Sequence, residues 1–122
     1  ELAKSGIFNW IAHMDLPKKL GLGEHEKWNP IKRDTVETIA TLGIPVEINT
    51  SGYKIGTNQP YPGTNILKML GQYDVPMLIS DDAHDTDRIG RDFGRAYTMA
   101  RKNGIKNFPT LQKILDFRRK SL

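Results

Sequence analysis

The sequence predicts an α/β fold in which parallel strands alternate with helices. Short apolar runs of strand length recur along the chain, segments with apolar residues at helical spacing lie between them, and glycine or proline marks most boundaries. The chain has 122 residues, 38% hydrophobic and 26% charged, which is the composition of one ordinary domain with a core. A complete (β/α) barrel needs about 250 residues, so three or four such units make roughly half of one.

The strand candidates are four short apolar segments. They are residues 7–12, 45–49, 77–80 and 105–108. The second is β-branched but is interrupted by Glu47, which shares one face of the strand with Asn49 because side chains alternate. A buried carboxylate persists only when it is paired or metal-bound. We expect Glu47 to pair with an interior Lys or Arg.

Helices are expected between and after these strands. They cover residues 31–42, 64–70 and about 89–103, and Leu111, Ile114 and Leu115 mark a closing helix. Asn29 is expected to cap the first helix, with Pro30 in its first position and Gly43 at its end. In the third helix, apolar residues at positions 89, 93, 96, 97 and 100 form one stripe, which is typical of a face that packs on the core.

Composition excludes several classes of function. The chain has no cysteine, which excludes disulfides, thiolate metal sites and cysteine nucleophiles. No apolar stretch approaches the roughly 18 residues of a membrane span, and there is no secretory signal, so we expect a soluble, cytoplasmic protein. The net charge of +4 is concentrated at the C-terminus, in Lys113, Arg118, Arg119 and Lys120. We interpret this run as a solvated helix end and do not expect nucleic-acid binding.

Polar clusters follow three of the expected strands, at residues 12–15, 47–52 and 80–85. Ligands bind at the carboxyl ends of parallel strands. Asp82 and His84 could therefore aim a carboxylate and an imidazole into one opening, where His13 could join them, and such donors suit zinc, manganese or iron. Alternatively, Asp85 caps the following helix and the histidines are ordinary packed or exposed residues. His25, in a charged loop, is expected to be a surface residue.

Three motifs in order resemble one known family. They are residues 11–19 (IAHMDLPKK), 45–52 (PVEINTSG) and 80–84 (SDDAH), with Tyr61-Pro62 before a helix. Together they are similar to the C-terminal half of histidinol phosphatases of the PHP (polymerase and histidinol phosphatase) superfamily. The resemblance runs through nearly the whole chain, and three ordered motifs are far more specific than any one alone.

The resemblance implies a distorted (β/α)7 TIM-like barrel with up to three divalent metals, Mn, Zn or Fe, at its carboxyl mouth. Residues 1–122 would be the C-terminal part of such a domain, without the N-terminal half of the barrel. By motif, His13, Asp82 and His84 are the implied metal ligands. Asp82 is also the implied catalytic residue, because it could orient a metal-activated hydroxide for attack on phosphorus.

Two departures from the family pattern concern substrate and completeness. Relatives tend to carry an arginine shortly after Thr-Ser-Gly, where this chain has Tyr53 and Lys54. Lys54 could offer the substrate phosphate a point charge, although lysine does not replace a bidentate arginine. The family's N-terminal His-x-His motif has no counterpart, since the histidines are only 13, 25 and 84. We therefore expect this piece alone to be inactive or nearly so.

The resemblance thus implies a fragment of a metal-dependent phosphomonoester hydrolase of histidine biosynthesis. Its substrate would be a small phosphorylated molecule, L-histidinol phosphate, converted to L-histidinol and phosphate. A PHP phosphoesterase acting on a nucleotide or another small phosphate, and a non-catalytic binding or assembly module, are the alternatives. Exposed strand edges of a half barrel also favour a dimer or a swapped assembly.

Overall fold

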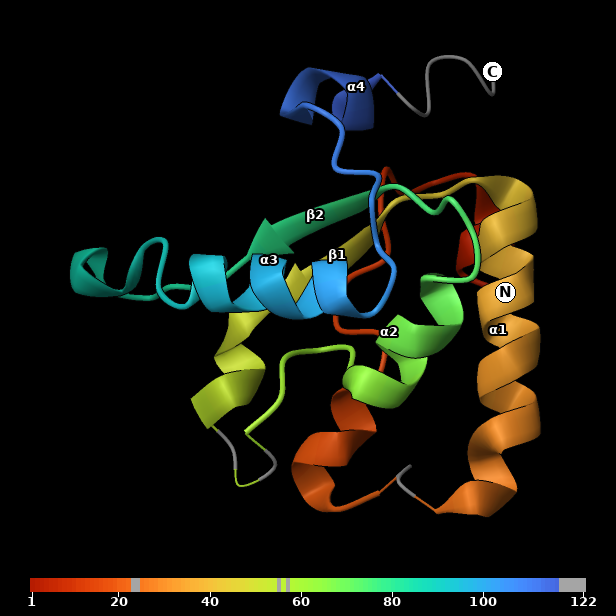
Figure 1. Ribbon diagram of the computed structural model, residues 1–122. Helices are drawn as coiled ribbons and strands as arrows, with labels where there is room; N and C mark the ends of the chain where they lie inside the picture. Colours follow the sequence, from red (N-terminus) through yellow and green to blue (C-terminus); the bar gives the residue numbers. More distant parts are fainter. Residues whose placement is uncertain (23–24, 55, 57, 117–122) are drawn as a thin grey trace.

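The computed structural model describes residues 1–22, 25–54, 56 and 58–116 (Figure 1). Its longer elements are α1 (Asn29–Leu42), β1 (Val46–Asn49), α2 (Thr64–Leu70), β2 (Met77–Ser80), α3 (Phe93–Lys102) and α4 (Leu111–Leu115). Short 3-10 helices stand at η1 (Ala3–Ser5), η2 (Leu16–Leu20), η3 (Glu26–Trp28), η4 (Thr50–Lys54) and η5 (Thr86–Arg88). The basic residues 118–120 of the predicted C-terminal run lie outside the described residues.

The sheet is small and parallel, as an α/β fold requires. β1 pairs with β2 in the register Val46↔Met77 to Asn49↔Ser80. Ile11 extends the sheet by one bridge beside Val46, where the Ile11 N–H donates to the Pro45 carbonyl at 2.8 Å. The predicted mixture of helices and parallel strands is confirmed at this level.

Two of the four predicted strands are wrong in extent. Of residues 7–12 only the bridge at Ile11 joins the sheet, because Ile7 and Phe8 at the start of the run are exposed and meet no partner strand. Residues 105–108 contribute one bond, from the Met77 N–H to the Asn107 carbonyl at 2.9 Å. Pro109 follows directly, and proline restricts the residue before it and lacks a donor of its own, so pairing stops there.

α1 ends as predicted but begins differently. Gly43 terminates it in the left-handed conformation, at φ 65°, which glycine adopts without a Cβ clash. Asn29 is not the cap, because η3 runs directly into α1 and the Asn29 N–H already donates to the Glu26 carbonyl. α1 buries Val36 and Ile39.

The core lies between the sheet and three helices. α3 packs on β2, and α1 packs on α2 (Figure 1). The largest contributions come from apolar side chains that are almost fully buried, among them Ile39, Val46, Ile48, Leu67, Leu70, Met77, Ala96 and Ala100. Of the predicted stripe, Ile89 lies outside α3 and is 73% exposed, because left-handed backbone at Gly90 and Asp92 delays the start of the helix until Phe93.

α4 lies at the end of the described chain, to one side of the sheet (Figure 1), and buries Ile114. The Asn9 side-chain amide donates to the Leu115 carbonyl at 2.8 Å, which ties α4 to the N-terminal segment. Within the described part of the chain, none of the helices is both long and apolar enough to cross a membrane.

Candidate metal and phosphate site

Three segments bring polar side chains to the carboxyl edge of the sheet. His13 lies two residues after the Ile11 bridge, Glu47 lies within β1, and Asp82 lies two residues after β2 ends at Ser80. Because Ile11, β1 and β2 are parallel, they deliver these residues to one edge.

His13 lies between two carboxylates. Its Nδ1 is 3.5 Å from Glu47 Oε2, and its Nε2 is 3.7 Å from Asp82 Oδ2. The backbone N–H of His13 also donates to Glu47 Oε2, at 3.1 Å. The Glu47 side chain is 9% exposed and that of Asp82 is 49% exposed, so one carboxylate is enclosed and the other faces solvent.

Glu47 is held by a chain of hydrogen bonds across the two strands. Ser80 Oγ donates to Glu47 Oε1 at 2.6 Å, and Asn49 Nδ2 donates to Ser80 Oγ at 3.2 Å. The prediction that Glu47 pairs with a Lys or Arg is wrong, since Glu47 contacts His13 and Ser80 instead. Glu47 is therefore a site residue that was not predicted, although its interruption of an apolar strand was the signal.

Both His13 and Asp82 have left-handed backbone, with φ of 48° and 52°. Such conformations cost a residue other than glycine about 1–3 kcal/mol and concentrate at functional sites. The fold therefore holds both residues in unfavourable conformations at the same edge of the sheet.

The remaining predicted residues are not drawn into this arrangement. His84 is exposed and takes part in none of the ion pairs among the described residues, and Lys54 is exposed at the end of η4. Over the described ranges, no group of three or more His, Asp or Glu side chains could hold a metal ion. The predicted ligand set of His13, Asp82 and His84 stays a prediction.

Neighbouring polar residues have structural roles. Asp81 accepts hydrogen bonds from the backbone N–H groups of Ala83 and Gly90, which closes the loop after β2. Asp85 makes no capping bond and instead pairs with Arg88 at 3.2 Å. His25 is exposed, as expected.

A buried ion pair fastens the His13 segment to a second loop. Lys18 is 3% exposed, its Nζ lies 3.2 Å from Asp15 Oδ2, and it donates to the Pro60 carbonyl. Asp15 Oδ2 also accepts from the Gly63 N–H at 2.7 Å. Asp15 Oδ1 is buried without a hydrogen-bond partner. This pair joins the segment after Ile11 to the loop before α2, and it was not predicted from the sequence.

Tyr61 lies between the ion pair and the imidazole. Its ring centroid is 4.8 Å from Lys18 Nζ and 5.7 Å from the His13 ring centroid. Burial raises the pKa of the Tyr61 hydroxyl above its ordinary value of 10.0, and the negative charge of Asp15 raises it further. The hydroxyl therefore stays protonated across the neutral range.

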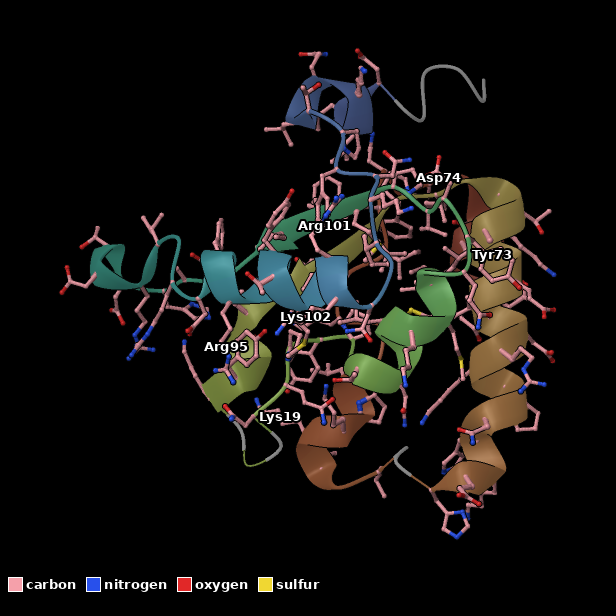
Figure 2. All side chains as sticks on the ribbon, viewed as in Figure 1. Lys19, Tyr73, Asp74, Arg95, Arg101 and Lys102 are labelled. Carbon is pink, nitrogen blue, oxygen red and sulfur yellow. The ribbon has the colours of Figure 1, made fainter. Side chains whose placement is uncertain are left out.

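An arginine from α3 packs over the loop that carries Lys54. Figure 2 shows Arg95 reaching towards η4, and its Cζ lies 3.9 Å from the centre of the Tyr53 ring. Its Nη2 donates to Asn58 Oδ1 at 3.1 Å. Burial raises the pKa of the Tyr53 hydroxyl, and the charge of Arg95 partly opposes this rise.

Comparison with known proteins gives two relatives. A "Probable histidinol-phosphatase" of Deinococcus radiodurans is 29% identical over 103 residues, which cover 84% of this chain and 38% of that protein. A protein of the same name from Schizosaccharomyces pombe is 26% identical over 111 residues, covering 84% and 36%. The resemblance to histidinol phosphatases is confirmed. The chain spans little more than a third of the length of these relatives, and no family model matches it.

Proposed function

We propose that this chain is the C-terminal part of a metal-dependent phosphomonoesterase that hydrolyses L-histidinol phosphate to L-histidinol and phosphate. Residues 1–122 would form a portion of a PHP-type (β/α)7 barrel in the cytoplasm. The observation that carries the proposal is the approach of His13 and Asp82 at the carboxyl edge of the sheet, in a chain whose relatives bear that name.

The donor chemistry of this edge suits a divalent cation. An imidazole nitrogen and a carboxylate are ligands for zinc, manganese and iron, and His13 Nε2 and Asp82 Oδ2 face each other at 3.7 Å. We propose that these two atoms bind the metal together with His84, and that a further segment supplies the other ligands. A divalent metal bound there would favour deprotonation of water and offset charge on phosphoryl oxygens.

The chain's own residues would bind and orient the reacting groups. The exposed carboxylate of Asp82 is free to accept a proton from water, or to hold the water in line with phosphorus. Lys54, exposed after Tyr53, would contribute a positive charge for the phosphate.

The test is phosphate release from L-histidinol phosphate by a longer protein that contains this chain, supplied with Mn²⁺. We expect activity that chelation abolishes and manganese restores, and little or none from the 122 residues alone. Release that survives complete chelation would contradict the proposal. A panel with nucleoside monophosphates separates the histidinol substrate from the alternative phosphoesterase.

Two aspartates of the loop after β2 give a matched pair of variants. In the longer protein we expect Asp82→Asn to lower kcat by at least about 10²-fold, because positioned acid–base groups contribute about that much. Asp85→Asn, which removes an exposed ion pair with Arg88, should leave kcat nearly unchanged. Equal activity of the two variants would instead favour a non-catalytic module.

A further inference from the structure

We propose that Glu47 is a positioning residue that fixes the proton of neutral His13 on Nδ1 and leaves Nε2 free to bind a cation beside Asp82. This inference deepens the proposed function and rests on it for the identity of the cation. The proton position itself can be measured without metal and without catalysis.

The Glu47 carboxylate faces the Nδ1 side of the His13 ring. Glu47 Oε2 lies 3.5 Å from Nδ1 and accepts the His13 backbone N–H at 3.1 Å. A lone pair on Nδ1 would face this carboxylate oxygen and be repelled, whereas an N–H there is attracted to it. The same oxygen therefore holds the backbone of His13 and favours the ring tautomer with the proton on Nδ1.

The Asp82 carboxylate favours the opposite tautomer of His13, so its effect has to be compared with that of Glu47. Asp82 Oδ2 is 3.7 Å from Nε2 and would favour a proton on that nitrogen. The Asp82 side chain is 49% exposed, compared with 9% for Glu47, so water screens the Asp82 charge far more. Because the Glu47 carboxylate is both closer and less screened, we expect the tautomer with the proton on Nδ1 to be the more populated one.

The orientation of Glu47 is itself fixed. Ser80 donates to Oε1 at 2.6 Å, which leaves Oε2 directed at His13, and Asn49 donates to Ser80 Oγ at 3.2 Å. Carboxylates that orient metal-binding histidines in this way typically change metal affinity by 10–100-fold when they are removed. Ser80 on β2 thus fixes the orientation of the Glu47 carboxylate on β1.

The experiment is a long-range ¹H–¹⁵N correlation spectrum of the metal-free, ¹⁵N-labelled chain. At mildly alkaline pH, the two ring-nitrogen shifts in this spectrum report directly whether the imidazole is neutral and which nitrogen carries the proton. The chain supplies its own reference, because His25 Nδ1 accepts the Lys27 N–H at 3.1 Å and must therefore carry its proton on Nε2. We expect His13 to show the opposite form, with the proton on Nδ1.

Three variants test the cause. The attraction between an Nδ1–H and the Glu47 carboxylate at 3.5 Å is electrostatic, so Glu47→Gln, which removes the charge, should lower the Nδ1–H to Nε2–H ratio of His13 by about three- to tenfold. Asp82→Asn should leave the Nδ1–H form dominant or strengthen it. Ser80→Ala, which frees Oε1 but keeps the carboxylate, should shift the ratio in the same direction as Glu47→Gln but by less.

Two results would overturn the inference. One is a His13 proton on Nε2 in the unsubstituted chain. The other is a ratio that neither Glu47→Gln nor Ser80→Ala changes, and the second variant decides if the first does not fold. Failure of the phosphatase assay leaves these spectra unaffected, so the two proposals fail separately.

Discussion

The two sides of the candidate site are built differently. On the side of His13, a buried ion pair, an enclosed carboxylate and the Tyr61 ring surround the segment. On the side of β2, Asp82 is about half exposed, His84 is exposed, and the loop is closed mainly by the local contacts of Asp81. One half of the donor set is therefore fixed by the fold, whereas the other is open to solvent.

The largest contrast is expected between two ion pairs. Lys18→Met leaves Asp15 buried without its cation, and breaking a buried pair costs about 3–5 kcal/mol in the free energy of unfolding. Arg88→Met removes the exposed pair with Asp85 and should cost at most about 1 kcal/mol. Urea denaturation of both variants measures the difference.

A double variant sharpens this test. Replacing Asp15 by Leu together with Lys18→Met removes both charges, so it should recover a large part of the lost stability. Equal stability of the Lys18 and Arg88 single variants would show that the two sides are not held differently.

A smaller contrast is expected between two glycines. A Cβ on Gly52, in η4, would lie 2.5 Å from the Gln59 carbonyl oxygen, so Gly52→Ala must displace backbone and should destabilise by about 1–3 kcal/mol. Gly94, in α3, has open space, and Gly94→Ala should stabilise by about 0.5–1 kcal/mol because alanine favours the helix. Thermal unfolding of both variants should give shifts of opposite sign, and shifts of the same sign would contradict this.

The smallest effect is a pH dependence on the enclosed side. The folded chain raises the pKa of Tyr61 above 10.0, so the folded state binds this proton more tightly than the unfolded state. The resulting stability is complete below about pH 10 and is lost as the pH rises through the higher folded value. Tyr61→Phe should flatten the decline in unfolding free energy above pH 10, measured by urea titration at several pH values. An unchanged slope would show that Tyr61 does not contribute to it.

The helices were predictable because their signals are local. α2 has the predicted bounds, α4 contains the apolar residues that marked the closing helix, and Gly43 ends α1 as its sequence context requires. β1 and β2 were also located, since each is a short apolar run with a proline before it. The predicted strand at 7–12 was wrong because strand pairing depends on a partner elsewhere in the chain, which periodicity does not reveal.

The site was predictable only in part, for the same reason. His13 and Asp82 were named from their positions after strands, and the structure brings them together. The partner of Glu47 lies 34 positions away in the chain, and the partner of Lys18 at Pro60 lies 42 positions away. No local pattern relates such distant residues, so the wrong partner was assigned to Glu47 and Lys18 was overlooked.

At His13 and Asp82 the left-handed backbone lowers the stability of the fold, while the side chains supply the donor atoms of the candidate site. Glycine at either one would relax the main chain and remove the donor atom in a single step. Selection for a firmer fold would therefore tend to erase this site, and its persistence in a lineage would be a sign that the lineage still uses it.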